Sequence, residues 1–471
     1  MPQPEISSEV PERIQRVQQG LWLDPSAWSQ IGQRATLAER MAFHVTPGVS
    51  IAVINNGEVE WARGYGVIEA GKPDPVTPDT IFQACSISKH VAMLAVLRLV
   101  QDGRLELDED VNRYLQSWKL PASRTWQPRV TIRQLLGHTA GLTQNWYRGF
   151  RRGAATPTLL QVLEGHPPAN TPPVRVALLP GSQFRYSGSH YTVLQQLMMD
   201  ATQTPFPELM QTLIFQPLGM QHSSYDQTYP ETHAGPTAVG HYIGGEAVHG
   251  NWRVIPEMAG AGLWTTATDL AQIACEIQRA HRGHPSRFLT KAVVDEALHP
   301  YGMPTFGLGL QLEGTGSAQR FGHGGDNIGY KCLTTAYLEH GLGAVVLTNG
   351  DDGIWVALEL LHGIAEEYRW PDYLPNRTAM EATGCDTADF VGIYELQADF
   401  VLTIVQAEHA LRLTAPNQAP IELYSVSDTT FCAHTVSTEV TFERDATGVV
   451  TGLLLRQEGE TCRLLKGRRP A

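Results

Sequence analysis

The sequence predicts an α/β chain whose antiparallel sheet is assembled from both ends of one large domain, followed by a small all-β module. Segments rich in β-branched residues occur at 49–54 and 59–65 and return only after residue 305. The hydrophobic spacing between them is mainly helical. Short strand-like segments without helices follow from residue 386. We therefore expect a sheet flanked by helices, an all-helical region, and a separate antiparallel barrel or sandwich.

The first elements form the edge of the predicted sheet. Residues 1–46 are mainly helical in pattern, with a loop around residue 24. The strands at 49–54 and 59–65 are joined by Asn56-Gly57, a sequence that tolerates positive φ and favours a hairpin turn. This pattern predicts an antiparallel pair at one side of the sheet.

Three helices are predicted next, and the first of them is expected to be buried in the core. Residues 86–100 are apolar on nearly every face, which predicts a helix buried in the core. Gly103 is placed to end this helix, because a left-handed residue commonly follows a helix. A 3.6-residue spacing predicts another helix over 191–202. A further helix begins just after residue 266, with Thr268 or Asp269 as its cap.

The C-terminal half of the sequence returns to strands. Three are predicted for the large domain, at 306–312, 329–338 and 343–347, and a helix over 355–368 closes it. Six more strands are predicted for the β module, at 391–396, 401–405, 410–414, 423–426, 440–444 and 453–456. We therefore divide the chain into a large domain (1–370), a polar linker with prolines (371–385) and a C-terminal β domain (386–471).

Composition narrows the function classes. The chain of 471 residues carries 48 acidic and 35 basic side chains, a net charge of −13, so bulk charge does not favour nucleic acid as a partner. No apolar stretch reaches the ~18 residues that span a membrane, and the first residues lack the pattern of a signal peptide. Six scattered cysteines without a C-x-x-C pair favour free thiols. We expect a cytoplasmic protein with no membrane partner.

Ser86-x-x-Lys89 is the first candidate for catalysis. Positions i and i+3 share a helix face, so the lysine amine can reach the serine hydroxyl. A serine needs a neighbouring base to act as a nucleophile, and a lysine becomes that base when burial lowers its pKa. The apolar run around Lys89 supplies the burial. The alternative is a cap serine beside a surface lysine, because this short pattern is common.

Tyr186-Ser187-Gly188 is the second candidate, in a turn-rich loop that opens the helix at 191–202. A phenol held near a lysine ammonium can have its pKa lowered from ~10 and can shuttle a proton. Ordinary packing of a loop tyrosine is the alternative.

The third candidate is Phe-Gly-His-Gly-Gly-Asp-Asn at 321–327, just before the strand predicted at 329–338. Glycines at a strand edge let a ligand approach the backbone, where N–H groups can stabilise an oxyanion. His323 can hydrogen-bond to a substrate or to the tyrosine. A β-turn with a satisfied histidine is the alternative.

Other catalytic signatures are missing from the sequence. It contains no G-x-S-x-G, no G-x-x-x-x-G-K-[ST] and no H-E-x-x-H. The glycine run at 322–329 does not open a βαβ unit, so a dinucleotide site is not expected. His138 and His323 lack a third ligand at a supporting spacing. We expect neither a metal nor a cofactor.

The three motifs, in this order, resemble the serine β-lactamase and penicillin-binding-protein superfamily, in its class C-like branch of esterases and D-amino-acid peptidases. That family carries S-x-x-K, then Y-x-N, then K-T-G or H-x-G. Further segments look like family segments, at 135–142, 180–187, 217–220 and 262–270. The resemblance covers about residues 30–370 and implies a β-lactamase-like fold. The segment 386–471 resembles the lipocalin-like barrel appended to some members.

The resemblance implies a role for each matching residue. Ser86 would be the acylated nucleophile and Lys89 its general base. Tyr186 would move protons to the leaving group and from water, and His323 stands where other members have lysine. The oxyanion hole would use the N–H groups of Ser86 and Asp326.

Two departures from the family pattern bear on the substrate, which Gly188 and Gly325 are also expected to border. Gly188 replaces the asparagine that binds the amide side chain of β-lactams and peptides. His323 removes the permanent charge that pairs with the β-lactam carboxylate. Both favour an ester, or a D-peptide, over a β-lactam.

We therefore predict a serine hydrolase that cleaves a small ester, amide or D-amino-acid peptide through a Ser86 acyl-enzyme, as a carboxylesterase-like or D-peptidase-like enzyme. A true class C-like β-lactamase and a non-catalytic penicillin-recognising sensor are the alternatives. The C-terminal domain is a candidate surface for a homo-oligomer.

Overall fold

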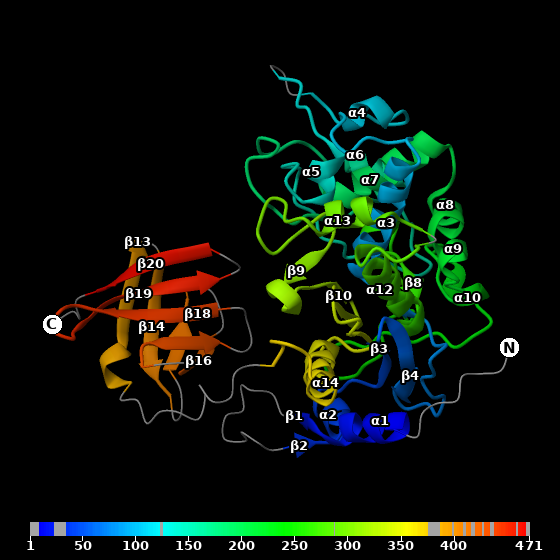
Figure 1. Ribbon diagram of the computed structural model, residues 1–471. Helices are drawn as coiled ribbons and strands as arrows, with labels where there is room; N and C mark the ends of the chain where they lie inside the picture. Colours follow the sequence, from blue (N-terminus) through cyan, green and yellow to red (C-terminus); the bar gives the residue numbers. More distant parts are fainter. Residues whose placement is uncertain are drawn as a thin grey trace. The chain divides into compact units, whose positions relative to one another are not determined.

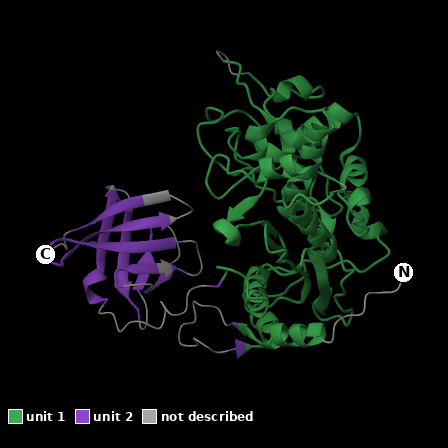
Figure 2. Cartoon of the chain, in the orientation of Figure 1, with its two compact units in different colours: residues 1–21, 35–373 green, residues 22–34, 374–471 purple. Residues whose placement is uncertain are grey.

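The computed structural model describes residues 9–22, 34–122, 126–286, 288–374, 387–397, 400–407, 411–415, 420–425, 428–433, 438–457 and 460–467. The chain divides into two compact units, residues 1–21 with 35–373 and residues 22–34 with 374–471 (Figure 2). The loop expected around residue 24 lies outside the described residues, as does the predicted linker from residue 375 onward.

A six-stranded antiparallel sheet organises the first unit (Figure 1). Its strands, in spatial order, are β4 (Glu58–Gly66), β3 (Gly48–Asn55), β12 (Gly343–Thr348), β11 (Tyr330–Tyr337), β10 (Arg320–Asn327) and β9 (Gln311–Glu313). β3 pairs with β12 from Val49↔Thr348 to Ile54↔Gly343, so the two ends of the domain meet in the sheet as predicted. Asn56 and Gly57, with φ of 54° and 77°, form the predicted β3–β4 turn.

Successive residues of each strand point to opposite faces of the sheet, and helices cover both faces. Val345 and Leu347 of β12 join the large core with α12 (Ala267–His281). The intervening Val346 is also fully buried, and α14 (Gly353–Glu367) packs on β11 and β12. Two N-terminal helices, α1 (Glu9–Gln19) and α2 (Leu37–Phe43), pack in turn on α14.

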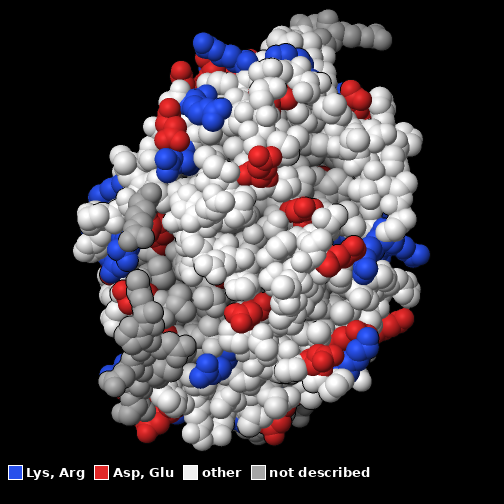
Figure 3. All heavy atoms as spheres, turned by 90° about the vertical axis from the view of Figure 1, so that its right-hand side faces the viewer, with Lys and Arg blue, Asp and Glu red and all other residues white. Residues whose placement is uncertain are grey.

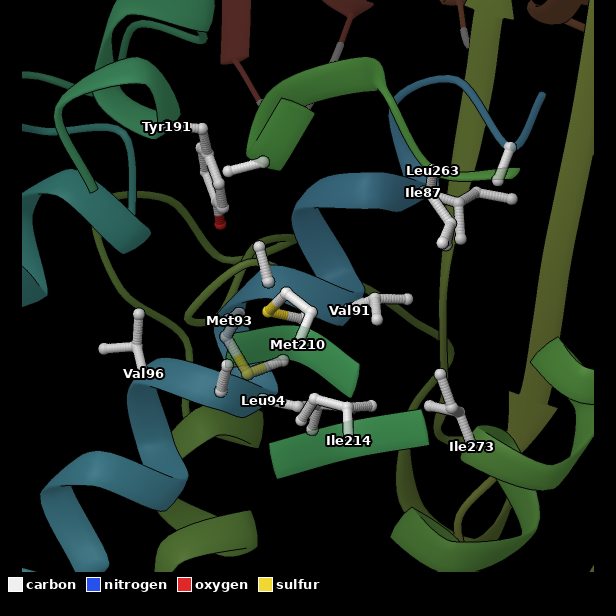
Figure 4. Packing of buried hydrophobic residues seen from close by; sticks show 14 of the residues in the cluster. Ile87, Val91, Met93, Leu94, Val96, Tyr191, Met210, Ile214, Leu263 and Ile273 are labelled. Carbon is white, nitrogen blue, oxygen red and sulfur yellow. The ribbon is translucent and has the colours of Figure 1, made fainter. Parts of the chain in front are cut away.

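Helix α3 (Ile87–Gln101) is the centre of the large core, as its apolar sequence predicts (Figure 4). Its Val91 and Leu94 pack among residues from several other helices, including Met210 and Ile214. Gly103 follows the helix with φ of 68°. The other helices of this region are α4 (Val111–Tyr114), α5 (Ile132–Leu136), α6 (Leu159–Glu164), α7 (Gly188–Thr202), α8 (Phe206–Met210), α9 (Gln216–Leu218), α10 (Tyr229–Thr232), α11 (Met258–Ala261) and α13 (Lys291–Leu298).

The second unit is a closed, eight-stranded antiparallel barrel, which confirms the expected C-terminal barrel. Its strands are β13 (Gly392–Gln397), β14 (Phe400–Gln406), β15 (Leu411–Thr414), β16 (Ile421–Ser425), β17 (Thr430–Ala433), β18 (Thr438–Arg444), β19 (Val450–Gln457) and β20 (Glu460–Lys466). Pairing of β13 with β20 closes it. Phe390 stacks on Phe442 in its core, with ring centroids 4.3 Å apart.

Several sequence predictions need correction. The helix predicted after residue 266 is capped by the Thr266 side chain, which accepts from Asp269 N, and not by Thr268 or Asp269. The strand predicted at 306–312 is reduced to β9, while residues 321–327 form strand β10 rather than a turn. Strands β17 and β20 were not predicted.

On the face shown in Figure 3, Lys and Arg side chains are interspersed with Asp and Glu. Among the described residues, no helix combines the length and the apolar character needed to cross a bilayer.

A buried ion pair joins α2 to α14 and generates a stability prediction. Arg40 Nη2 and Nε lie 2.7 and 2.9 Å from the carboxylate of Glu359, and His44 Nε2 lies 3.2 Å from the same group. Replacing Glu359 with alanine leaves a buried guanidinium without its carboxylate, and we expect the free energy of unfolding to fall by about 3–5 kcal/mol. Eight of the ten tryptophans lie in the first unit, so tryptophan fluorescence in urea reports mainly on the unfolding of that unit.

The matched control is Lys72→Ala, which removes an ion pair between Lys72 and Glu69 at the surface. Exposed pairs contribute little, so this variant should unfold at nearly the same urea concentration as the unchanged protein. Equal losses in the two variants would contradict a special role for the buried pair.

Candidate active site

Ser86 lies at the start of α3, where the chain turns from strand to helix. The preceding Cys85 has a φ of 51°, a conformation rarely adopted by residues other than glycine. The Ser86 side chain makes no capping hydrogen bond. Instead, Lys89 Nζ donates to Ser86 Oγ at 2.9 Å. The alternative interpretation of Ser86 and Lys89, a capping serine beside a surface lysine, therefore does not describe this pair.

The amine of Lys89 is enclosed by the protein. The residue is 1% exposed, and Nζ also donates to the Gly260 carbonyl at 2.8 Å. Nζ lies 5.1, 5.3 and 5.9 Å from the ring centroids of Tyr186, Tyr147 and Tyr191. Burial lowers the pKa of Lys89 to about 7. A large fraction of this amine is therefore neutral near pH 7 and able to accept a proton.

Tyr186 lies beside both groups, but its titration differs from the sequence expectation. Burial raises the pKa of Tyr186 above its usual value, and a hydrogen bond with the Ser86 side chain only partly opposes this rise. The expected lowering of this pKa is wrong, because removal of the phenol from water outweighs its hydrogen bond with Ser86. Tyr186 is therefore a neutral phenol that can donate a proton in one step and recover it in another.

A pair of buried histidines lies against Tyr186. His138 Nδ1 and His190 Nδ1 are 2.8 Å apart, and the His138 ring lies 4.3 Å from the Tyr186 ring. Burial lowers the pKa of both histidines, and each also lies near the Lys89 amine. Two neutral imidazoles therefore support the tyrosine without adding a fixed charge to the site.

His323 lies on β10 with its ring 6.2 Å from that of Tyr186. Burial, and then the charge of Lys89, lower the pKa of His323 to about 4. Nδ1 lies 2.5 Å from the Gly324 carbonyl, which requires the proton on Nδ1. Nε2 then carries a lone pair, and it is buried with no hydrogen-bond partner among the described residues. The neutral ring can accept a hydrogen bond at Nε2.

Gly325 is the point where β10 meets the segment before the nucleophile. A Cβ at this position would lie 2.8 Å from both the Ala84 carbonyl oxygen and Cys85 Cβ, and 2.3 Å from Cys332 Sγ. No side chain fits without moving the backbone beside Ser86. Glycine is therefore required for this close approach.

The peptide group of Asp326 faces the open side of β10. His323 N donates to Thr334 Oγ1 on β11, so the His323 N–H points toward that strand. Successive N–H groups of a strand alternate in direction, which turns the Asp326 N–H away from β11. β9 pairs with β10 only from Arg320 to Gly322 and does not reach this group. The Asp326 carboxylate itself is exposed and pairs with Lys331 at 2.9 Å.

Gly188 begins α7 and is buried, and its carbonyl accepts a hydrogen bond from the Tyr147 hydroxyl. From the sequence, Tyr147 is a candidate to line the pocket with ordinary packing as the favoured alternative, His138 was considered only as a metal ligand, and Gly260 was not identified. No spacing signal connects them to Ser86, because they reach it from three separate segments. Among the described residues, no group of three or more His, Cys, Asp or Glu side chains has the arrangement of a metal site.

The Beta-lactamase family model matches residues 34–369, and the chain therefore belongs to this family. This confirms the serine β-lactamase and penicillin-binding-protein superfamily that the order of the three motifs predicted.

Two curated relatives and two solved structures illustrate the range of the family. Protein flp of Staphylococcus aureus (strain N315) is 28% identical over 189 residues, which cover 39% of this chain and 35% of that protein. The match thus spans about a third of the relative's length. Penicillin-binding protein 4* of Bacillus subtilis (strain 168) is 24% identical over 438 residues, 86% of this chain and 91% of its own.

The two structures share the fold at low identity. The octameric penicillin-binding protein homologue from Pyrococcus abyssi has a TM-score of 0.62 and 21% identity, covering 91% of this chain and 98% of its own. A D-amino acid amidase from Ochrobactrum anthropi SV3, complexed with L-phenylalanine, has a TM-score of 0.58 and 20% identity, with coverage of 77% and 100%.

The pKa of Lys89 generates a pH prediction. Only the neutral amine can accept the Ser86 proton, so labelling of Ser86 by a fluorophosphonate should be fast above pH 7. Below that pH the rate should fall by about tenfold per unit as the amine becomes protonated. The labelling rate is measured between pH 5 and 9 by mass spectrometry of the intact protein.

Glu257→Gln is the control, because burial also raises the pKa of Glu257 to about 7. This variant should keep the same midpoint. A flat profile in the unchanged protein, or loss of the midpoint in Glu257→Gln, would show that Lys89 does not govern the reactivity of Ser86.

The close approach at Gly325 generates a second prediction. In Gly325→Ala the new methyl group must displace the backbone next to Ser86, and we expect kcat for p-nitrophenyl acetate to fall by about 100-fold. In Gly324→Ala the new Cβ meets only Leu333 Cδ2, at an ordinary 3.4 Å, so kcat should change little. Equal activities of the two variants, at matched thermal stability, would show that the close approach at Gly325 is not needed for activity.

Proposed function

We propose that the protein hydrolyses small esters, or short amides including those of D-amino acids, through an acyl-enzyme on Ser86. The observation that carries this proposal is the 2.9 Å hydrogen bond between Ser86 Oγ and the buried amine of Lys89, whose pKa of about 7 suits a general base. Tyr186 and His323 lie around this pair, from segments distant in the sequence.

Acylation follows from these positions. The neutral Lys89 amine takes the hydroxyl proton while Ser86 Oγ attacks the substrate carbonyl carbon. The carbonyl oxygen becomes an oxyanion, for which we assign the N–H groups of Ser86 and Asp326 as donors. The tetrahedral intermediate collapses as the bond to the leaving group breaks, and the Tyr186 phenol gives its proton to the departing alkoxide or amine. Lys89 then returns the proton to the tyrosine.

Deacylation reverses the roles. The Tyr186 phenol passes its proton to the neutral Lys89 amine and takes one from a water molecule, whose oxygen attacks the acyl carbon. The bond from that carbon to Ser86 Oγ breaks, and the serine oxygen recovers its proton from Lys89. The carboxylic acid leaves, and the groups return to their first protonation states.

Two features favour a substrate without a carboxylate or an acylamido group. His323 is neutral at physiological pH, since burial and Lys89 lower its pKa to about 4, so it offers a lone pair rather than a positive charge. A carboxylate substrate would meet no fixed cation at this residue. Gly188 likewise offers no side chain for an acylamido group. Both features support an ester or short amide over a β-lactam.

The names of the relatives support the same range of substrates. The neighbours include a D-amino acid amidase and a hydrolase with promiscuous acyltransferase activity, which makes ester and D-amide substrates reasonable for this chain. The octameric homologue supports the proposal that this chain also forms a homo-oligomer, with its C-terminal barrel as the candidate contact. A cytoplasmic location and the domain limits at 370 and 386 remain predictions.

The decisive experiment labels the protein with a fluorophosphonate and identifies the modified residue by mass spectrometry. We expect label at Ser86 alone. Ser86→Ala should reduce hydrolysis of p-nitrophenyl acetate by at least about 1,000-fold, since it removes the nucleophile. Ser88→Ala is a useful comparison, although Ser88 is buried and accepts from Leu263 N, so its thermal stability must be measured too. Turnover that persists in Ser86→Ala would end the proposal.

The same preparation ranks the alternatives. We expect hydrolysis of p-nitrophenyl acetate and D-Ala-p-nitroanilide well above that of nitrocefin. Faster turnover of nitrocefin would instead favour a β-lactamase. Stable acylation by penicillin without turnover of any ester would favour a penicillin-recognising sensor.

A further inference from the structure

Tyr147 fills the space beside Gly188, where the second motif of the family has a side chain. A Cβ at Gly188 would lie 2.5 Å from Tyr147 Cζ and 2.8 Å from its hydroxyl oxygen. A Cβ at Gly260 would lie 2.2 Å from Cε2 on the other edge of the same ring. The end of this phenol is thus held between two glycines. No side chain fits at residue 188 while Tyr147 keeps this position.

The hydroxyl group of Tyr147 is hydrogen-bonded within the protein. Its hydroxyl donates to the Gly188 carbonyl and lies 3.2 Å from Thr192 Oγ1. The residue as a whole is half-buried, but enclosure of its hydroxyl raises the pKa of Tyr147 well above its usual value. The phenol is therefore neutral and has no free proton to offer a substrate.

The ring also borders the catalytic groups. Its centroid is 5.3 Å from Lys89 Nζ, and the amine bonds to the carbonyl of Gly260, against which the ring packs. The neighbouring Trp146 is 61% exposed and stacks on Tyr186 at 6.1 Å. At Gly188 and Gly260, this side of Ser86 therefore presents the aromatic surface of Tyr147, while the carboxamide of Gln144 donates to the Tyr186 carbonyl at 3.1 Å.

We infer that Tyr147 is a specificity-determining residue, which closes the place of an acylamido-binding side chain and disfavours acyl groups that carry an amide. The inference rests on the proposed hydrolysis through Ser86. A substrate amide placed against this wall would lose its hydrogen bonds to water and gain none in return, which disfavours its binding. The substrates expected to react well are esters of small apolar carboxylic acids.

The unchanged protein provides the first test. The p-nitrophenyl esters of butyric acid and N-acetylglycine share a leaving group and differ by an acylamido group. Each kcat/KM is divided by the rate constant of the same ester with hydroxide, which removes the difference in intrinsic reactivity. We expect the normalised value to favour the butyrate by at least about tenfold, the effect of roughly one unmet hydrogen bond. An equal or reversed preference overturns the inference.

Variants test whether Tyr147 is the cause. Gly188→Asn alone places a side chain against the ring, so activity toward both esters should fall at least about tenfold. The double variant Tyr147→Ala/Gly188→Asn frees the space, and its preference should shift toward the N-acetylglycine ester by about tenfold. Tyr147→Phe keeps the ring and should keep the butyrate preference. Gly71→Asn, at a site with nothing within 4 Å, controls for the substitution itself.

The outcomes separate this inference from the proposed function. If Ser86 of the unchanged protein takes no fluorophosphonate, the proposed function fails. If Ser86 is labelled in the double variant and the preference does not shift, only the role of Tyr147 fails. Full activity of Gly188→Asn on both esters would also refute it, because the ring would then not fill the space.

Discussion

The removal of the Lys89 amine from water is the constraint on which the rest of the site depends. A buried ammonium is costly unless the protein replaces its hydration, and the structure replaces only part of it. The amine keeps two hydrogen bonds, to Ser86 and to the Gly260 carbonyl, and three tyrosine rings surround it. Because this compensation is incomplete, the pKa falls to about 7 rather than remaining near that of a surface lysine. The interior position of α3 is thus a chemical requirement as well as a packing solution.

Glycines allow the remaining segments to reach this amine. Gly325 lets β10 approach the backbone before Ser86, while Gly188 and Gly260 together enclose the Tyr147 ring. Each of these contacts is too close for a Cβ, so the three segments could not meet around α3 with ordinary residues. The sheet fixes β10 from one side through its pairing with β11. The helical region brings Tyr147 from the other, and the candidate catalytic groups lie where the two meet.

The sequence predicted those features that depend on local pattern. The β3–β4 hairpin, the buried helix α3 and most barrel strands follow from hydrophobic spacing and turn residues. Strand β10 was missed because glycines at 322, 324 and 325 have poor strand propensity, and its pairing with β11 overrides that preference. The motifs identified Ser86 and Lys89, but the contribution of Tyr147 depends on a close packing that spacing does not encode. The direction of the Tyr186 pKa shift was wrong for the same reason, since burial is a property of the folded chain.

The groups around Ser86 share one electrostatic property, which links the chemistry to the substrate. Burial lowers the pKa of Lys89 and His323 and raises that of Tyr186, so each is driven toward its neutral form. Lys89 also lowers the pKa of His323, which means that the two are not readily charged together. A group in this cluster therefore becomes charged mainly when a proton is transferred to or from it, and it becomes neutral again when the next step moves the proton on. A site of this kind stabilises charge that develops during the reaction better than charge that a substrate brings with it. This property, together with the aromatic wall formed by Tyr147, is the physical basis for proposing an ester or short amide as the substrate rather than a carboxylate-bearing β-lactam.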